Sequence, residues 1–237
     1  MKEETTDIGQ DIINTIMERP YSFEVNGRTL YLYPNTLGKS LLISELLKGA
    51  DINSKNIRLN PLAEALRVCL AKKDEVCRII AIRTLRTKKD VFCAPLVAKR
   101  VKIISELSMD DLAVLLVAAL KDDDIDRYIK HFGIDEERKW QDKAMKVKND
   151  RNTLTFGGRS IYGTLIDNAC QRYGWTFEYV VWGISYTNLK MLMADVVNTV
   201  FLTDEERKRV HIPNDRNVIN MDNAQSSIEL IKKMNWD

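Results

Sequence analysis

The sequence predicts a mainly α-helical protein with a single β-hairpin near its N-terminus. Apolar residues recur every three or four positions along most of the chain, as they do from Ile161 to Tyr173, which is typical of amphipathic helices. A strict alternation of polar and apolar residues is clear only around Asn26-Gly27. The composition, with 45% hydrophobic and 30% charged residues, is that of an ordinary globular protein. We expect a helical N-terminal domain that carries the hairpin, and a smaller all-α C-terminal domain.

The N-terminal region predicts a short helix followed by the hairpin. Isoleucines share one side of a helix over residues 7–18, which Pro20 ends. Asn26-Gly27 suits a type I′ turn, because both central residues of that turn need a positive φ. An isolated hairpin is marginal in water, so its apolar face must cover helices or the hairpin must pair with strands of another chain, a route to self-association. That face consists of Phe23, Val25, Leu30 and Leu32.

A helix follows Pro34, and the Gly38-Lys39-Ser40 sequence near its start invites comparison with a phosphate-binding loop. That loop also needs a glycine five residues before Gly38, where this chain has Tyr33. We therefore reject a nucleotide-binding motif. Lys39 and Ser40 are expected in the exposed first turn of the helix.

The next helical pattern opens at Asn60-Pro61 and continues past Lys72, where a bend or break is expected. Residues 72–102 hold ten basic and three acidic side chains, a local charge of +7. This asymmetry is typical of a solvated face shared by several helices, and it also suits an acidic partner or a nucleic-acid backbone. Because Phe92 is the only aromatic residue in the window, a protein partner is favoured over stacked bases. The candidate basic docking face consists of Lys72, Lys73, Arg78, Arg83, Arg86, Lys88 and Lys89.

Two acidic turns and a charged segment complete the N-terminal part. Ser108 begins one helix with acidic residues in its first turn, and the run at residues 122–124 begins another that ends at Gly133. That run lacks the pattern of a calcium loop. Residues 135–156 are predicted to form a solvated helix or a linker, because the charged part of this segment has almost no stripe of apolar residues. We therefore expect domains at residues 1–134 and 157–237.

The C-terminal part contains the most hydrophobic and aromatic stretch of the chain. Ser160 and Gly174 are typical of the two ends of a helix, a short aromatic turn follows, and the apolar pattern predicts another helix from Leu189 to Phe201. A capping-box signature begins at Thr203, and a last helix ends at Trp236.

Most of these apolar residues suit the core of a small helical domain. The C-terminal segment, residues 151–237, nevertheless has little volume in which to bury so many aromatic rings. Some of these rings are therefore expected at the surface, as a docking face for another protein. The candidate contacts are Trp175, Phe177, Tyr179, Trp182, Tyr186, Leu189 and Met193.

No metal, cofactor or catalytic site is expected. The cysteines, Cys69, Cys77, Cys93 and Cys170, are widely spaced within apolar patterns and predict reduced core thiols. The chain has only two histidines and no nucleophile elbow. The loop over residues 156–160 could hold an anion through backbone N–H groups and Arg159, although an interdomain turn is the simpler explanation.

The net charge, the lengths of the apolar runs and the N-terminal sequence indicate where in the cell the protein is expected. A net charge of +2 provides no general attraction to nucleic acid or to an anionic membrane. No apolar run has the length of a membrane span, and the N-terminus lacks the regions of a signal peptide. We expect a cytoplasmic protein.

Three stretches resemble the tail assembly chaperones of long-tailed bacteriophages: F-x-V-N-G-R…L-Y-L, I-S-E-L-S-M-D-D-L-A-V-L-L and Y-G-W-T-F-E-Y-V-V-W-G-I-S-Y-T-N-L-K-M-L-M-A-D. The resemblance covers about Tyr21–Leu120 and Gly157–Phe201. It implies a non-enzymatic, self-associating scaffold in the host cytoplasm. Such a scaffold coats the tape-measure protein, recruits tail-tube protein and leaves before the virion is complete.

Two other functions remain open. One is a nucleic-acid-binding or regulatory phage protein that uses the basic face. The other is a permanent structural component of the virion.

Overall fold

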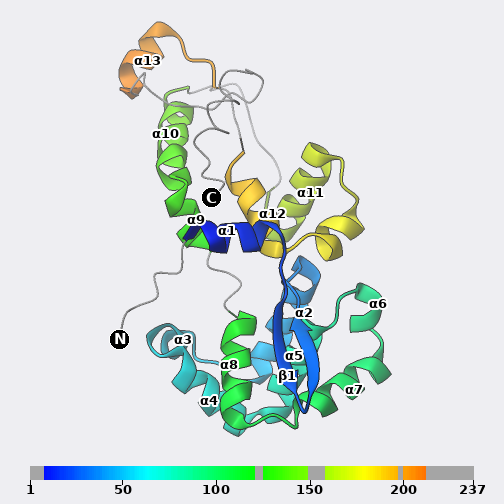
Figure 1. Cartoon of the computed structure of the whole chain (residues 1–237). Helices are drawn as coiled ribbons and strands as arrows, with labels where there is room; N and C mark the ends of the chain where they lie inside the picture. The colour runs from blue at the N-terminus through cyan, green and yellow to red at the C-terminus, as the bar shows by residue number, and fades with distance from the viewer. Residues whose placement is uncertain (1–7, 121–124, 149–157, 197–199, 212–237) are drawn as a thin grey trace. The chain divides into compact units, whose positions relative to one another are not determined.

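The computed structural model describes residues 8–120, 125–148, 158–196 and 200–211, and it confirms a mainly α-helical fold with one two-stranded antiparallel sheet near the N-terminus (Figure 1). Its elements, in chain order, are α1 (Ile8–Ile16), β1 (Tyr21–Val25), β2 (Arg28–Leu32), α2 (Leu37–Gly49), α3 (Ser54–Leu59), α4 (Pro61–Ala71), α5 (Lys73–Thr84), α6 (Lys88–Val91), α7 (Ala94–Ile104), α8 (Met109–Leu120), α9 (Ile125–His131), α10 (Ile134–Val147), α11 (Ile161–Tyr173), the π-helical turn η2 (Tyr179–Gly183), α12 (Tyr186–Ala194) and α13 (Asp204–Val210). The sequence patterns had not separated α3, α6 and α7 as individual helices.

The chain divides into two compact units. The first contains residues 1–135 and 154–197, and the second contains residues 136–153 and 198–237. This division differs from the predicted one, which placed all residues from 157 onward in a C-terminal domain. Residues 185–188 tie this stretch to the first unit, because their backbone and side chains donate hydrogen bonds to the end of α1 and to the segment between α1 and α2, which are remote in sequence.

The hairpin forms as predicted. Asn26 and Gly27 both have positive φ values, 48° and 74°, and Phe23 pairs with Leu30 across the sheet. Val25, Leu30 and Leu32 are buried and Phe23 is partly buried against the main core. The hairpin therefore covers helices of its own chain, with β2 against α5 (Figure 1).

Helix α5 lies at the centre of the main core. It packs against α2, α4, α7, α8 and β2, and Val76, Ile79 and Ile80 are fully buried. The expected break is present at Lys72, whose backbone leaves the helical region between α4 and α5. Helix α8 packs against α4 and α5, and its Leu112 and Leu116 are fully buried in the core.

Two positively charged residues lie inside this unit instead of on its surface. Arg83, predicted to belong to the basic face, is only 2% exposed, and Lys39, expected in an exposed turn, is 1% exposed. Arg83 is buried because it follows Ile79 and Ile80 by four and three residues, so all three share one helix face. Lys39 is buried because the first turn of α2 is covered by η2.

A second, smaller cluster of buried residues is formed by α11, η2 and α12. Ala169, Val180, Ile184 and Leu189 are its buried members. The predicted ends of α11 are confirmed, because Ser160 Oγ accepts a hydrogen bond from the Gly163 backbone N–H at 3.1 Å and Gly174 has a φ of 65°.

Helix α12 is shorter than predicted. It ends at Ala194 instead of Phe201, since Asp195 leaves the helical region with φ −101° and ψ 47°. Phe201 is 80% exposed, so this ring, the last of the apolar pattern, packs little against the rest of the chain. Because most helical stability comes from such packing, periodicity alone did not extend the helix.

The second unit contains most of α10 and all of α13. Along α10 the Lys143 ammonium lies 4.2 Å from the centre of the Trp140 ring, and Ala144 is buried. The predicted capping box of α13 is confirmed: the Thr203 N–H donates to Glu206 Oε2 at 2.8 Å, which lowers the pKa of Glu206. The acidic run at residues 122–124, Phe156 and the predicted last helix with Trp236 lie outside the described residues.

Candidate functional site

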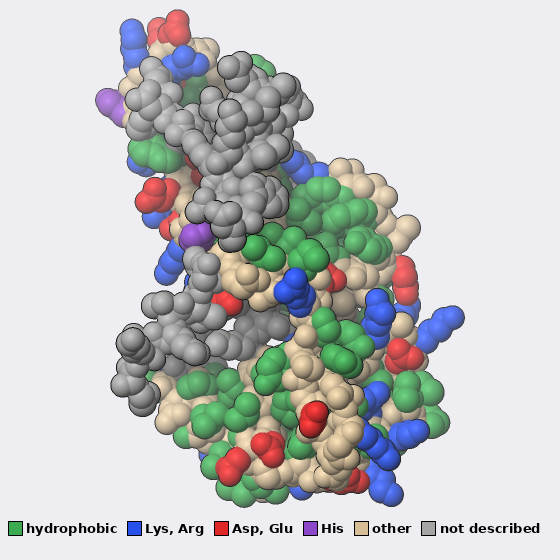
Figure 2. All heavy atoms as spheres, in the orientation of Figure 1, with side chains coloured by type: hydrophobic (Ala, Val, Ile, Leu, Met, Phe, Trp, Pro, Cys, Tyr) green, Lys and Arg blue, Asp and Glu red, His purple; other side chains and the backbone are tan. Residues whose placement is uncertain are grey.

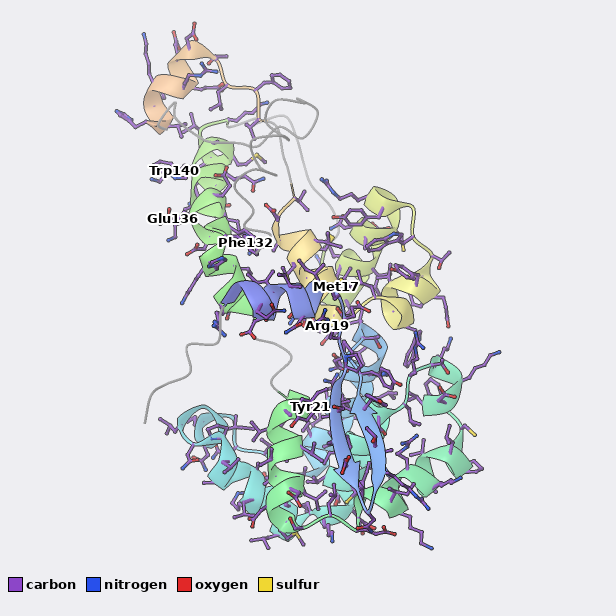
Figure 3. All side chains as sticks on the ribbon, viewed as in Figure 1. Met17, Arg19, Tyr21, Phe132, Glu136 and Trp140 are labelled. Atoms are coloured by element: carbon purple, nitrogen blue, oxygen red, sulfur yellow. The ribbon has the colours of Figure 1, made fainter. Side chains whose placement is uncertain are left out.

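The first unit contains a groove of about 1290 Å³ that is open to solvent. Three parts of the chain line it: the end of α1 with the segment leading into α2, the residues from Arg86 to Phe92, and the residues from Thr176 to Ser185. We call it the aromatic groove, because its lining includes the rings of Tyr33, Phe92, Tyr179 and Trp182. Met17 belongs to the lining at the end of α1, and Figure 3 shows it with Arg19 and Tyr21 on the path into β1.

Backbone and side-chain hydrogen bonds attach the η2 wall to the N-terminal part of the chain. The Tyr186 N–H donates to the Asn35 carbonyl at 2.6 Å, and Thr36 and Ser185 form an antiparallel bridge. Glu18 adds a side-chain contact, since its Oε1 accepts from the Ser185 N–H at 2.7 Å and from Asn188 Nδ2 at 3.3 Å. These bonds hold two walls of the groove together.

Glu18 adopts an unusual backbone conformation to make this contact. Its φ is 51°, in the left-handed region that residues other than glycine seldom occupy. Ser185 is the N-cap of α12, so the carboxylate of Glu18 lies at the positive end of that helix. The electrostatic attraction and the hydrogen bonds offset the cost of the backbone conformation.

The η2 wall is a π-helical turn. The Ile184 N–H donates to the Tyr179 carbonyl five residues earlier, at 3.1 Å. A Cβ atom at Gly183 would lie 2.3 Å from Cδ2 of Tyr179, so the turn leaves no space for a side chain at this position. π-helical turns are rare in proteins, and those that do occur are often found at functional sites. This turn directs Tyr179 and Trp182 into the groove lining.

Trp182 is fixed between the walls. Gly38 lies over one face of its indole, because a Cβ at Gly38 would be 2.7–2.8 Å from Cε2, Cζ2 and Cδ2 together. The Phe92 ring meets it edge to face at a centroid distance of 5.6 Å, and the Lys88 ammonium lies 5.9 Å from its centre. The indole is therefore a rigid part of the groove with little free ring face.

A second group of rings continues from the groove towards α11. Tyr173 and Trp175 stack with centroids 4.6 Å apart, and Trp175 meets Tyr179 edge to face at 5.1 Å. Figure 2 shows hydrophobic side chains gathered over α11 and the segment that follows it. The rings thus form a continuous surface from α11 to the groove.

The predicted docking residues fall into three groups. Phe177 and Tyr179 are 63% and 45% exposed, whereas Trp175, Trp182, Tyr186 and Met193 are partly buried. Leu189 is fully buried in the core of the second cluster and is not accessible to a partner. The structure adds Tyr33 and Phe92, which come from other parts of the chain. Phe92 was visible in the sequence as the single aromatic residue of the basic window, but its proximity to Trp182 was not.

Apart from the buried Arg83, the basic face separates into two sets. Arg86, Lys88 and Lys89 are exposed and line the groove, whereas Lys72, Lys73 and Arg78 lie outside its lining. Figure 2 shows Lys and Arg side chains gathered over α6 and α7. The structure thus brings part of the basic window and part of the aromatic stretch to one site.

Helix α6, which carries Lys88 and Lys89, begins with a capping box. Asp90 Oδ2 accepts from the Thr87 hydroxyl at 2.7 Å and from the Thr87 N–H at 3.0 Å, and these bonds lower the pKa of Asp90. The Lys88 ammonium reaches across to Glu178 Oε2 at 2.8 Å. Within the described parts of the chain, Arg86 and Lys89 form no ion pair.

A second, smaller hollow of about 420 Å³ is lined mainly by apolar side chains. Ile16, Phe132, Ile184, Met191 and Leu192 contribute to its lining. Phe132, which is labelled in Figure 3, directly follows α9. Its side chain is 52% exposed.

The positions of the cysteines differ in part from the prediction. Cys69 and Cys77 are buried, and burial raises the pKa of the Cys69 thiol to about 11. Cys93, expected in the core, is exposed because it occupies the N-cap position of α7 at the surface. Among the residues that the structure describes, no three His, Cys, Asp or Glu side chains are grouped as metal ligands. No helix in the same residues has the length and apolar character needed to cross a membrane.

None of the family models, curated proteins and solved structures compared with this chain matches it. Its function is therefore inferred from the geometry of the groove and from the resemblance of the three sequence stretches.

Proposed function

We propose that this chain is a non-enzymatic assembly chaperone of a bacteriophage tail, which shields the tape-measure protein and recruits tail-tube subunits. The observation that supports it most is the aromatic groove, where the exposed rings of Phe92 and Tyr179, from two remote segments, lie beside the partly buried Trp182 with cations in the same lining. Exposed apolar surface of this kind marks sites of protein–protein interaction. Aromatic residues are also enriched among those that dominate binding energy.

The dimensions of the groove suit a polypeptide better than a small molecule. Sites for small ligands enclose most of the ligand in about 300–1,000 Å³. The aromatic groove is larger, at about 1290 Å³, and it is open. Its walls are held by the Glu18 and Asn35 hydrogen bonds, so a partner would meet a preformed surface and lose less entropy on binding.

Co-expression with the tape-measure protein of the same phage, followed by affinity capture, tests the proposal. The wild-type chain should retain the tape-measure protein and keep it in the supernatant. The double variant Phe92→Ser/Phe177→Ser should lose most of this capture. Phe92 lines the groove and Phe177 lies between the lining residues Thr176 and Glu178, and both rings are over 60% exposed, so their removal spares the core.

Leu59→Ser/Ile161→Ser is the matched control, because these two apolar side chains are also exposed but belong to none of the three segments that line the groove. It should retain capture. Equal capture by all three proteins, or a tape-measure protein that stays equally soluble alone, would refute the proposal. In purified virions, mass spectrometry should find the chain absent, whereas a permanent structural component would be present.

Nucleic-acid binding is the second candidate, because the groove places Tyr33 and Trp182 near Arg86 and Lys89. Proteins that bind single-stranded nucleic acid combine basic side chains, which contact the phosphates, with aromatic rings on which the bases stack. The face of Trp182 covered by Gly38 argues against stacking at that ring. Binding of a labelled oligonucleotide that weakens steeply with salt would support this function. No binding at low salt would exclude it.

A further inference from the structure

The acidic side chains that line the aromatic groove all have partners, whereas two of its basic side chains do not form ion pairs in the part of the chain that the structure describes. Its two carboxylates are both engaged, with Glu178 bound to Lys88 at 2.8 Å and Glu18 bound to the Ser185 N–H at 2.7 Å. Arg86 and Lys89 are exposed in the same lining and form no ion pair within the described residues. The groove therefore presents cations, but no available carboxylate, to whatever enters it.

We infer that the aromatic groove binds an acidic, apolar segment of a partner protein. Asp or Glu side chains of that segment pair with Arg86 and Lys89, while an apolar side chain contacts Phe92, Tyr179 and Trp182. This inference rests on the proposed function and adds the chemistry of the partner. Charge complementarity of this kind determines partner choice and speeds association.

The arrangement of the walls supports both parts of this recognition. Residues 86–92 supply the cations and Phe92, and residues 176–183 supply Tyr179 and Trp182. The Lys88–Glu178 ion pair connects the two walls, so Lys88 is already occupied. Arg86 lies just before the capping box of α6 and Lys89 lies within this short helix. Because the walls are anchored at both sides, the cations and the rings are presented together.

A protein segment fits this site better than a nucleic-acid strand. Stacked bases need open ring faces, whereas Gly38 covers one face of Trp182 and the Phe92 ring packs edge to face against it. Tyr179 packs over Gly183 and against Trp175. The exposed parts of these rings offer apolar contact of the kind that Leu, Ile or Phe side chains make in a groove.

Selection from a displayed library of random peptides of about 15 residues tests the inference, because this length allows an extended or a helical segment. Three full-length proteins are used as targets: the wild type, Arg86→Glu/Lys89→Glu, and Lys99→Glu/Lys102→Glu. The last pair carries the same change of charge on exposed positions of α7 outside the groove lining. Circular dichroism checks that all three are folded alike.

Peptides selected on the wild type and on the α7 variant should be enriched in Asp and Glu together with apolar residues. A synthetic peptide from that pool should bind the Arg86→Glu/Lys89→Glu variant at least about tenfold more weakly than the wild type. Neutral or basic pools, no enrichment, equal binding to the groove variant, or displacement of the peptide by an oligonucleotide would each overturn the inference.

The same charge variant separates this inference from the proposed function. If it captures the tape-measure protein normally while Phe92→Ser/Phe177→Ser does not, the chaperone function stands and the acidic character of the partner is refuted. If neither variant changes capture, both proposals fail.

Discussion

Trp182 and Gly38 are in direct contact across about 140 residues of sequence, and a Cβ at position 38 would lie 2.7 Å from Cε2 of the indole. This contact seats η2 on the first turn of α2. It explains why a glycine occupies this position in the first turn of α2. The groove depends on it, because Trp182 is one of its lining residues.

Gly38→Ala should destabilise the protein by about 1–3 kcal/mol, because overpacking costs more than the helix gains from alanine. Urea unfolding measures the change, and the tryptophan emission of the folded protein should shift as the Trp182 indole moves. Gly49→Ala is the control within the same helix, since nothing lies within 4 Å of a Cβ at that position. This control should be neutral or stabilising by up to about 1 kcal/mol. A neutral Gly38→Ala would contradict the observed contact.

Glu18→Gln should lower the free energy of unfolding by about 1–2 kcal/mol, because the charged acceptor for the Ser185 N–H is lost. Glutamine has nearly the same size and shape as glutamate, so the substitution changes the charge of the acceptor and little else. Glu178→Gln is the comparison, since both side chains of its ion pair with Lys88 are exposed to solvent. It should cost less than about 1 kcal/mol. Chemical denaturation of both variants measures the difference, and equal losses would argue against a special role for Glu18.

Stability should fall as the pH drops from about 4.5 towards 2 partly because of Glu64. The Arg67 guanidinium, at 2.7 Å, and the Asn53 N–H hold the pKa of this buried carboxyl at about 2, below its ordinary value of 4.5. In this window the unfolded state binds more protons than the folded state, so the contribution is complete above pH 4.5 and is lost on acidification.

Glu64→Gln should therefore be less stable than the wild type at about pH 7 and should lose less stability on acidification to about pH 3. Urea unfolding at the two pH values provides the comparison. Glu45→Gln, at an exposed position of α2, should keep the pH dependence of the wild type. An unchanged slope in Glu64→Gln would show that its carboxyl does not contribute.

Thiol labelling should distinguish Cys93 from the buried cysteines. In the folded protein at neutral pH, Cys93 should react quickly with an aromatic disulfide reagent, because its side chain is exposed. Cys69 should react only after unfolding, since it is buried and its pKa of about 11 keeps it protonated. Cys93→Ser should remove the fast phase. Cys170 is partly exposed, so any slower labelling of the folded variant is attributed to that thiol. A fast phase of unchanged amplitude in Cys93→Ser would contradict the placement of Cys93.

Local signals in the sequence predicted individual elements well. Asn26-Gly27 determined the hairpin turn, Ser160 and Gly174 determined the ends of α11, and the Thr203 capping box determined the start of α13. Each signal acts through hydrogen bonds or φ values within a few residues, so no distant contact was needed to recognise it.

Other features could not be predicted because distant segments decide them. The burial of Lys39, the end of α12 at Ala194 and the membership of residues 154–197 in the first unit depend on which surfaces meet. The groove itself was divided in the sequence between a basic window and an aromatic stretch, about ninety residues apart.

The sequence by itself determined the helical class, the hairpin and the caps, because backbone preferences and apolar periodicity are local properties of the chain. Only the tertiary structure decided that Trp182 lies against Gly38 and Phe92, with Arg86 and Lys89 lining the same groove. That arrangement arises from packing and from the hydrogen bonds of Glu18 and Asn35, which join residues far apart in the chain.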